Sequence, residues 1–206
     1  MQLIILMGIS LSGKTYLEHK LANNNIIDPI ITSTTRPKRN GEINGKTYYF
    51  VNNQEYQKAL TNHEALAPRE YHVAHDETWS YYLDKTNLIK QFMSATHERP
   101  KLLILDLKGY LDLFNIIKQS NDPILKKLHI SGLYLDIPIK ERIERYLTTP
   151  RSHDDSQEFV RRLYDDEFNA FKDLDKPEYC KKYRIKVVNN NLDALLYLQG
   201  MYQYKD

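Results

Sequence analysis

A short apolar run that leads into a glycine-bearing turn constrains this chain more than any other feature. Residues 3–7 read Leu-Ile-Ile-Leu-Met, and a glycine follows them directly. A continuous apolar run that stops at glycine predicts a strand buried on both faces of a parallel sheet. Residues 14–22 then carry Leu17 and Leu21 four positions apart, which predicts a helix. The chain is therefore expected to begin as strand, tight loop and helix.

The loop between this strand and this helix has the spacing G-x-x-x-x-G-K-[ST], which is typical of the P-loop of nucleotide-binding proteins. Its glycines let the backbone curl until N–H groups point at phosphate oxygens, and the helix N-terminus adds partial positive charge. Lys14 is expected to reach the β- and γ-phosphates, and the Thr15 hydroxyl to bind Mg²⁺. We therefore predict a protein that uses ATP and Mg²⁺. The predicted ATP-binding residues of the loop are Gly8, Ser10, Ser12, Gly13, Lys14 and Thr15.

Strand-like runs alternate with helix-like segments toward both ends of the chain, which predicts an α/β fold with a mostly parallel sheet flanked by helices. The predicted strands are 3–7, 26–32, 48–51, 102–105, 129–135 and 185–188. The predicted helices are 14–22, 53–62 (begun by an Asn cap), 84–93 (capped by Asp84), 111–118, 139–147, 156–174 and 192–202. A hairpin is predicted within 64–83, and the mixed segment 33–83 is interpreted as an insertion into the sheet domain.

Composition limits the partners of the chain. Its 206 residues suit one domain with an inserted lobe, and a formal net charge of +2 argues against a protein that coats nucleic acid. The apolar run at 3–7 is too short to span a membrane and lacks the pattern of a signal peptide. The single cysteine, Cys180, cannot form a disulfide within the chain. We expect a cytoplasmic protein whose partners are small molecules, with no nucleic acid and no membrane among them.

The segment 32–51 points to a second phosphate site. It packs Arg36, Lys38 and Arg39 within four residues and continues to a tyrosine pair that begins at Tyr48. Arginine binds phosphate through two parallel hydrogen bonds, and a tyrosine hydroxyl can add a donor. The alternative is a solvated basic loop that leads into a hairpin. The residue types alone leave both interpretations open.

The same segment resembles the guanylate kinase signature, in which a hydroxyl residue precedes T-T-R-x-P-R-x-G-E-x-x-G-x-x-Y-x-F-V. The residues that keep this spacing are Thr34, Thr35, Arg36, Arg39, Gly41, Glu42, Gly45, Tyr48, Phe50 and Val51. The proline stands one place earlier, at Pro37. The resemblance implies phosphoryl transfer from ATP to a nucleoside monophosphate, GMP or dGMP above all. It also implies that Arg36, Arg39 and Tyr48 hold the acceptor phosphate and that Thr32 contacts the base.

The part of the chain that would read the acceptor base departs from the family pattern. Glu70 is the best match to the family glutamate that binds guanine, with Glu64 and Glu77 as alternatives. Tyr81 matches a family tyrosine, with Tyr82 as its alternative. The glycine and the hydroxyl residue that should follow this tyrosine are missing, because Tyr82 and a leucine stand there. Packing in the inserted lobe is the other interpretation of these tyrosines.

The run Leu105-Asp106-Leu107-Lys108-Gly109 resembles the family segment I-L-D-x-D-x-Q-G. The resemblance assigns Asp106 to the second aspartate, which reads the base, while Ile104 replaces the first. A carboxylate that follows a buried parallel strand lies at the edge where ligands bind in such sheets. Capping of the next helix is the alternative role for Asp106.

The polar stretch after residue 148 resembles the family lid, R-G-T-x-x-x-E-x-I-x-x-R-L. Arg151 and Arg162 keep the family separation of eleven residues, and Ser152 replaces the glycine. The resemblance makes Arg151 and Arg162 the catalytic cations, with Arg145 a further candidate. The run that begins at Asn189 is similar to the family sequence V-N-D-D-L, which would place Asn189 near the adenine of ATP. Helix capping is the alternative role for this asparagine cluster.

The resemblance divides the chain into a core (1–32, 84–144 and 160–206), an inserted monophosphate-binding lobe (33–83) and a lid (145–159).

Two functions other than that of a guanylate kinase are also compatible with the sequence. One is a related P-loop kinase with a different phosphorylated acceptor, such as a ribose bisphosphate, which the departure after Tyr81 favours. The other is a non-catalytic guanylate-kinase-like binding module. Such modules typically lose the P-loop lysine, which Lys14 retains here.

Overall fold

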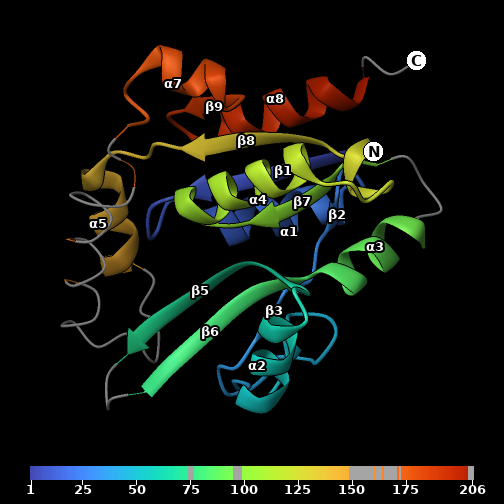
Figure 1. Ribbon diagram of the computed structural model, residues 1–206. Coiled ribbons are helices and arrows are strands. Elements are labelled where there is room, and N and C mark those ends of the chain that lie inside the picture. The colour runs from blue at the N-terminus through green and yellow to red at the C-terminus, as the bar shows by residue number, and fades with distance from the viewer. Residues whose placement is uncertain are drawn as a thin grey trace. The chain divides into compact units, whose positions relative to one another are not determined.

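The computed structural model of the protein describes residues 1–73, 77–94, 99–148, 160, 164, 171 and 173–203 (Figure 1). The chain divides into two compact units. The P-loop unit comprises Gln2–Pro29, Arg99–Lys108 and His129–Asp206. The hairpin unit comprises Met1, Ile30–Glu98 and Gly109–Leu128.

The P-loop unit is built on a five-stranded sheet in which every pairing is parallel. Its strands, in spatial order, are β2 (Asp28–Pro29), β7 (Lys101–Ile104), β1 (Gln2–Gly8), β8 (His129–Leu135) and β9 (Ile185–Val188). Figure 1 shows β1 between β7 and β8. The apolar residues of β1 are buried on both of its faces, as predicted for a central strand of a parallel sheet. The predicted α/β fold with a mostly parallel sheet is confirmed.

Two helices, α1 (Lys14–Asn23) and α8 (Asn191–Gln203), pack on one face of this sheet. Leu17 and Leu21 lie one helical turn apart on α1, so both point into the core, where they join Ala194 and Leu198 of α8. The other described helices of the unit are α5 (Ile139–Thr148) and α7 (Pro177–Lys182). Because all five strands run in one direction, the loops that follow β1, β7 and β9 meet at one edge of the sheet. The P-loop, Asp106 and Asn189 therefore lie at that edge.

The hairpin unit contains a four-stranded sheet with the order β4-β3-β6-β5. Its strands are β3 (Ser33–Thr34), β4 (Tyr49–Phe50), β5 (Ala65–Val73) and β6 (Glu77–Asp84). β5 and β6 are antiparallel, which confirms the predicted hairpin. The predicted turn residues His75 and Asp76 lie outside the described residues. A one-residue irregularity interrupts the pairing between Leu66 and Arg69, where Ala67 has a positive φ of 46°.

Directly paired residues of antiparallel strands point to the same face, so the hairpin has two chemically different faces. The tyrosine face carries the cross-strand pairs Arg69–Tyr81 and Tyr71–Trp79. The α2 face carries Glu70 opposite Ser80, and Tyr82 opposite Ser33. The helix α2 (Asn53–Thr61) covers this second face, where its Tyr56 and Ala59 pack against Tyr82.

Further helices follow α2 in the hairpin unit. The Asp84 side chain accepts a hydrogen bond from the Asn87 backbone N–H at 2.7 Å and starts α3 (Lys85–Met93), as predicted. The helix α4 (Leu107–Gln119) belongs to the hairpin unit from Gly109 onward, and a short 3-10 helix, η2 (Leu125–Lys127), follows it. None of the helices in the described part of the chain is long and apolar enough to cross a membrane.

Several predicted boundaries are wrong. The strand predicted at 26–32 is only β2, because Pro29 has no N–H to continue the ladder. The predicted asparagine cap of α2 is confirmed, since Asn52 and Glu55 form a reciprocal capping box, and the helix ends at Thr61. The helix predicted at 111–118 begins at Leu107.

The helix predicted at 156–174 falls mostly outside the described residues, but its last part is not helical. Phe171 is a bend and 173–175 form a turn, in which the Lys176 backbone N–H donates to the Asp173 carbonyl at 3.2 Å. The short helix α7, which begins with Pro177, was not predicted. A tight turn over 173–175 therefore precedes α7, whose first helical position is the proline.

Ionisation of the Glu18 carboxyl on α1 is expected to make the stability of the protein depend on pH. Its side chain is half-buried, and this burial raises the pKa of the carboxyl from 4.5 to about 7. The folded protein then binds the proton more tightly than the unfolded chain, so the free energy of unfolding falls as pH rises from about 4.5 to about 7. We expect Glu18→Gln to raise the free energy of unfolding by about 1–3 kcal/mol at about pH 8. Urea denaturation measures this change.

At about pH 5 the wild-type carboxyl of Glu18 is protonated in the folded state, so the two proteins should differ little there. Glu144→Gln, a neutralisation of an exposed glutamate on α5, is the matched control and should shift stability by less than about 0.5 kcal/mol at either pH. An equal gain for Glu18→Gln at both pH values would contradict the burial argument.

Candidate functional site

The loop between β1 and α1 depends on two glycines whose positions admit no side chain. A Cβ on Gly8 would lie 2.6 Å from Ser12 Oγ and 3.1 Å from Leu135 Cβ. Gly13 has a φ of +93° and is the N-cap of α1, and a Cβ there would lie 2.5 Å from Asn191 Nδ2. Gly13 is therefore favoured by its backbone conformation, and Gly8 by the close approach of Ser12 and Leu135.

Lys14 folds back over the loop. Its Nζ donates to the carbonyl oxygens of Gly8 at 2.6 Å and of Ile9 at 3.0 Å. Thr15, next along α1, has an exposed side chain. Within the described part of the chain, Ser12 Oγ and Asn191 Oδ1 are buried without a hydrogen-bond partner. A tight backbone cradle, an ammonium group and an unpartnered serine hydroxyl that can donate a hydrogen bond together suit a polyanion.

A predicted lid cation reaches this loop. Arg145, in the last turn of α5, donates through NH1 to the Leu11 carbonyl at 2.9 Å, and its NH2 lies 3.5 Å from Glu141 Oε2. Leu11 holds a positive φ of 65°, which turns its carbonyl within reach of this guanidinium. The other predicted catalytic cations, Arg151 and Arg162, lie outside the described residues.

The three asparagines after β9 have different local roles. Asn190 caps α8, since its Oδ1 accepts from the Asp193 backbone N–H at 2.7 Å, in line with the capping alternative. Asn189 precedes this cap in a bend. Asn191 is the asparagine that lies beside Gly13 of the P-loop. No motif singled out Asn191, because the sequence does not show which member of an asparagine run points at the neighbouring loop.

In the hairpin unit, Arg36 is a buried charge held by a carboxylate. Its NH2 lies 2.6 Å from Glu42 Oε1, its NH1 donates to the Pro37 carbonyl at 2.9 Å, and its side chain is only 4% exposed. Burial alone would lower the pKa of Arg36, but the hydrogen bond with Glu42 and the nearby Tyr81 hydroxyl outweigh it and raise the pKa above its ordinary value. The same hydrogen bond lowers the pKa of Glu42. The pair is therefore ionised at neutral pH.

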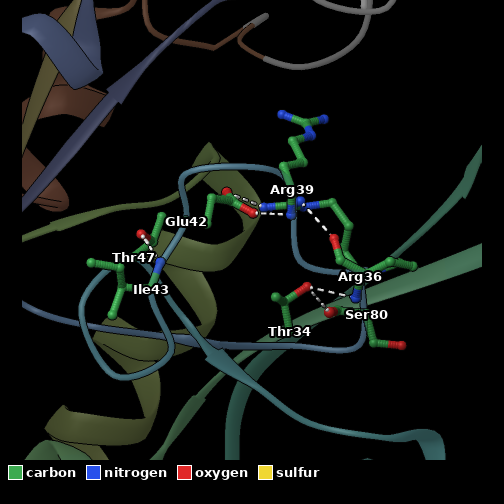
Figure 2. Close-up of polar contacts among 8 residues, drawn as sticks. Thr34, Arg36, Arg39, Glu42, Ile43, Thr47 and Ser80 are labelled. Carbon is green, nitrogen blue, oxygen red and sulfur yellow. Dashed lines mark hydrogen bonds and ion pairs between the residues drawn. The ribbon is translucent and has the colours of Figure 1, made fainter.

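Glu42 also orders Arg39. Its Oε2 accepts from the Arg39 backbone N–H at 2.7 Å, so one carboxylate joins the guanidinium of Arg36 to the main chain three residues later. Figure 2 shows the Arg39 side chain pointing away from Glu42 and Arg36. The interpretation of this segment as a solvated basic loop is wrong for Arg36, which is buried, while Lys38 and Arg39 are exposed.

Aromatic rings complete the surroundings of Arg36. Its guanidinium carbon lies 5.5 Å from the centroid of the Tyr48 ring and 5.7 Å from that of Phe50. The Tyr48 ring makes an edge contact with Tyr81 at 5.9 Å, and Tyr81 makes another with Tyr71 at 5.7 Å. The structure thus brings together Arg36, which follows β3, Tyr48, which precedes β4, and Tyr81 of β6. The main chain of Arg39 joins this cluster through Glu42.

Glu70 is not part of this cluster. It lies on the α2 face of the hairpin, where the Tyr56 hydroxyl donates to its Oε1 at 3.1 Å. Tyr56 is buried, and this burial, together with the Glu70 carboxylate, raises the pKa of the phenol to about 12. Without the irregularity after Leu66, simple alternation would place Glu70 opposite Trp79, on the tyrosine face.

The other predicted base-reading residues also have local partners. Glu64 accepts from the Thr86 hydroxyl at 2.9 Å, and Glu77 accepts from the Trp79 indole N–H at 3.1 Å. The Thr32 carbonyl accepts from the Tyr49 backbone N–H at 2.8 Å, so this residue lies where β3 meets β4. Asp106 lies between β7 and α4 in the P-loop unit.

A loop of the spacing G-x-x-x-x-G-K-[ST] between the central strand and the first helix of a parallel sheet is typical of P-loop nucleotide-binding proteins. The guanylate kinase family model matches residues 1–199, and the chain belongs to the guanylate kinase family. The resemblance stated from the sequence is confirmed.

Individual relatives agree with this membership. The guanylate kinase of Blochmanniella floridana is 28% identical over 202 residues, which cover 96% of this chain and 83% of that protein. That of Wolbachia pipientis wMel is 27% identical over 193 residues, which cover 93% and 83%. The crystal structure of guanylate kinase from Anaplasma phagocytophilum shares the fold, with a TM-score of 0.59 at 19% identity over 98% of this chain and 84% of that one.

Gly13 provides a structural test of the loop. We expect Gly13→Ala to lower the free energy of unfolding by about 1–3 kcal/mol, because alanine disfavours a positive φ and its Cβ would press on Asn191. Gly200→Ala is the matched control, since Gly200 lies in α8 with open space around its Cα. It should raise stability by about 0.5–1 kcal/mol through helix propensity. Urea denaturation of both variants checks the opposite signs, and a stable Gly13→Ala would contradict the observed loop geometry.

Proposed function

We propose that the protein is an ATP-dependent nucleoside monophosphate kinase that phosphorylates GMP or dGMP. The observation that carries this proposal is the ordered cluster of Arg36, Glu42, Tyr48 and Tyr81 in a chain that also contains a P-loop. Two anion-binding sites in one chain suit a reaction between two phosphate-bearing substrates. Membership of the guanylate kinase family supports the same reaction.

On the donor side, we propose that the P-loop residues Gly8, Ser10, Ser12, Gly13 and Lys14 bind the phosphates of ATP. The unpartnered Ser12 Oγ and the glycine cradle support this assignment. The Thr15 hydroxyl would hold Mg²⁺, which would offset the negative charge of the phosphates of ATP. Asn189, after β9, would lie near the adenine.

On the acceptor side, Arg36 and Arg39 would grip the phosphate of the monophosphate while Tyr48 and Tyr81 donate hydroxyl hydrogen bonds to it. Glu42 keeps the guanidinium of Arg36 in place when the site is empty. The family resemblance assigns the base to Thr32, Glu70 and Asp106.

Catalysis would consist of alignment and charge stabilisation. The phosphate of the acceptor is already ionised near neutral pH, so the reaction needs no general base from the chain. Lys14 and the cations Arg145, Arg151 and Arg162 would stabilise negative charge on the transferring phosphoryl group. The 2.9 Å contact of Arg145 with the P-loop backbone supports its inclusion. The lobe at 33–83 and the lid at 145–159 would exclude water when they close.

The partners of such a kinase are small-molecule nucleotides, and we expect it to work in the cytoplasm without nucleic acid or membrane.

A kinase with another phosphorylated acceptor is the second candidate. It is less well supported than a kinase for GMP, because the chain belongs to the guanylate kinase family, and it rests on two departures: a buried Leu83 stands where the family has a hydroxyl residue, and Glu70 points to the α2 face. A non-catalytic module is disfavoured because Lys14 lies over the P-loop.

The test is steady-state phosphoryl transfer from ATP to GMP, dGMP, AMP, UMP and a ribose bisphosphate. The proposal expects GMP or dGMP to have the highest kcat/KM. Turnover of ribose bisphosphate alone would establish the second candidate. ATP binding that is absent both with and without Mg²⁺ would instead point to the non-catalytic module.

Single substitutions separate the two substrate sites. Lys14→Ala should lower kcat about a hundredfold or more, because the ammonium group stabilises charge on the transferring phosphoryl group. Arg39→Ala should raise the KM for GMP about tenfold or more and leave the KM for ATP within about twofold, because its charge-assisted bonds go to the acceptor. Initial rates with each substrate varied in turn measure both effects.

Lys38→Ala is the matched control for Arg39→Ala, since both side chains are exposed cations of the same loop. It should change neither KM by more than about twofold if specific phosphate contacts, rather than the general charge of the loop, bind the acceptor. Equal effects of Arg39→Ala on ATP and GMP would contradict the assigned role.

A further inference from the structure

The tyrosine face of the hairpin carries an ion pair to which the proposed mechanism assigns no role. Arg69 NH2 lies 2.7 Å from Asp112 Oδ2. Arg69 belongs to β5 and Asp112 to α4, so the pair joins the hairpin to a helix of the same unit. The Arg69 side chain is 12% exposed and that of Asp112 is 41% exposed. The carboxylate therefore faces solvent while the guanidinium lies against protein.

This ion pair lies next to the residues proposed for the acceptor phosphate. Arg69 is directly opposite Tyr81 in the β5–β6 ladder. Such partners have Cβ atoms about 4.5–5.5 Å apart and share a face. Tyr81 in turn contacts Tyr48, whose ring covers Arg36. A nucleotide whose phosphate meets Arg36 and the tyrosines thus has Arg69 as a neighbouring polar group.

Glu70 has a different neighbourhood. The irregularity between Leu66 and Arg69 turns Arg69, rather than Glu70, toward the tyrosine face. Glu70, which is exposed, instead accepts a hydrogen bond from the hydroxyl of Tyr56 on α2. For Glu70 to read a base beside Tyr81, the strand would have to slip by one residue, which would move every side chain of β5 to the other face.

We propose that Arg69 and Asp112, and not Glu70, read the base of the acceptor nucleotide. The chemistry of the pair suits guanine: a carboxylate accepts from the ring N1–H and the exocyclic amino group, and a guanidinium donates to O6 and N7. The bound base would replace the contact that Arg69 and Asp112 make with each other in the structure. This inference rests on the proposed function, because it assigns the specificity of that same site.

The test is initial-rate kinetics of the full chain with GMP and with inosine monophosphate, which lacks the exocyclic amino group. Asp112→Asn should raise the KM for GMP about tenfold to a hundredfold and keep kcat within about twofold. It should also bring the ratio of kcat/KM for GMP to kcat/KM for inosine monophosphate close to one. Arg69→Gln should raise the KM for both substrates and leave that preference unchanged, because both bases present O6 and N7.

Asp173→Asn is the matched control. Asp173 Oδ1 lies 2.7 Å from Lys176 Nζ and its side chain is 46% exposed, so it resembles Asp112 in pairing and exposure but belongs to the P-loop unit. Its substitution should leave the kinetics with both nucleotides unchanged. Urea denaturation of each variant shows whether a lower kcat/KM results from a destabilised fold.

Two results would overturn the assignment. One is an unchanged base preference in Asp112→Asn together with a lost preference in Glu70→Gln, which would return the role to Glu70. The other is a fall in kcat/KM of Asp112→Asn that is equal for both nucleotides and is accompanied by a lower free energy of unfolding. That result would show that the ion pair only stabilises the fold. A wild-type protein that phosphorylates neither GMP nor any other monophosphate would instead refute the proposed function itself, and with it the substrate to which this inference refers.

Discussion

The parallel pairing of β1 with β7 on one side and β8 on the other is the constraint on which the P-loop unit depends. It buries residues 3–8 of β1 and fixes where Gly8 ends the strand. From that point the chain turns into α1 within a few residues, beside Leu135 and Asn191, and Gly13 takes a positive φ that favours glycine. Lys14 folds back over this turn, where its Nζ donates to the carbonyl oxygens of Gly8 and Ile9. The proposed phosphate site rests on this geometry, with Lys14 as the charged residue of the loop.

The hairpin unit uses a different device, a carboxylate that organises cations. Glu42 holds the guanidinium of Arg36 with one oxygen and the main chain of Arg39 with the other (Figure 2). Removing Arg36 from water is unfavourable without such a partner, and the aromatic rings around it strengthen the pairing by excluding solvent. The result is one arginine held in place and one directed outward from the same loop. The same principle recurs at Arg69 and Asp112, where a largely buried guanidinium meets a carboxylate that remains exposed.

Much of the architecture could be predicted because the signals were local. The strand β8 has the predicted bounds, α3 begins at its predicted cap, and the P-loop follows a strand and precedes a helix. The failures involve interactions that the chain makes across distance or at breaks in periodicity. Leu174, predicted to be helical, lies in a turn before Pro177. The choice among the asparagines after β9 depends on which one packs against Gly13. A one-residue irregularity in β5 reverses the faces of Arg69 and Glu70, and alternation read from the sequence does not reveal it.

The sequence by itself determined the family, the glycine-bearing loop after the first strand, and which arginine, glutamate and tyrosine residues are candidates for a second anion site. These are motifs in which the chemistry resides in residue types at short, constant spacing, so no long-range information is needed to recognise them. The tertiary structure decided which of these groups meet. It joined Arg36 to Tyr48 and Tyr81 and placed Arg145 on the P-loop. It also turned Glu70 away from them and paired Arg69 with Asp112. The physical reason is that strand register and helix packing are set by the whole core, and a shift of a single residue exchanges one face of a sheet for the other.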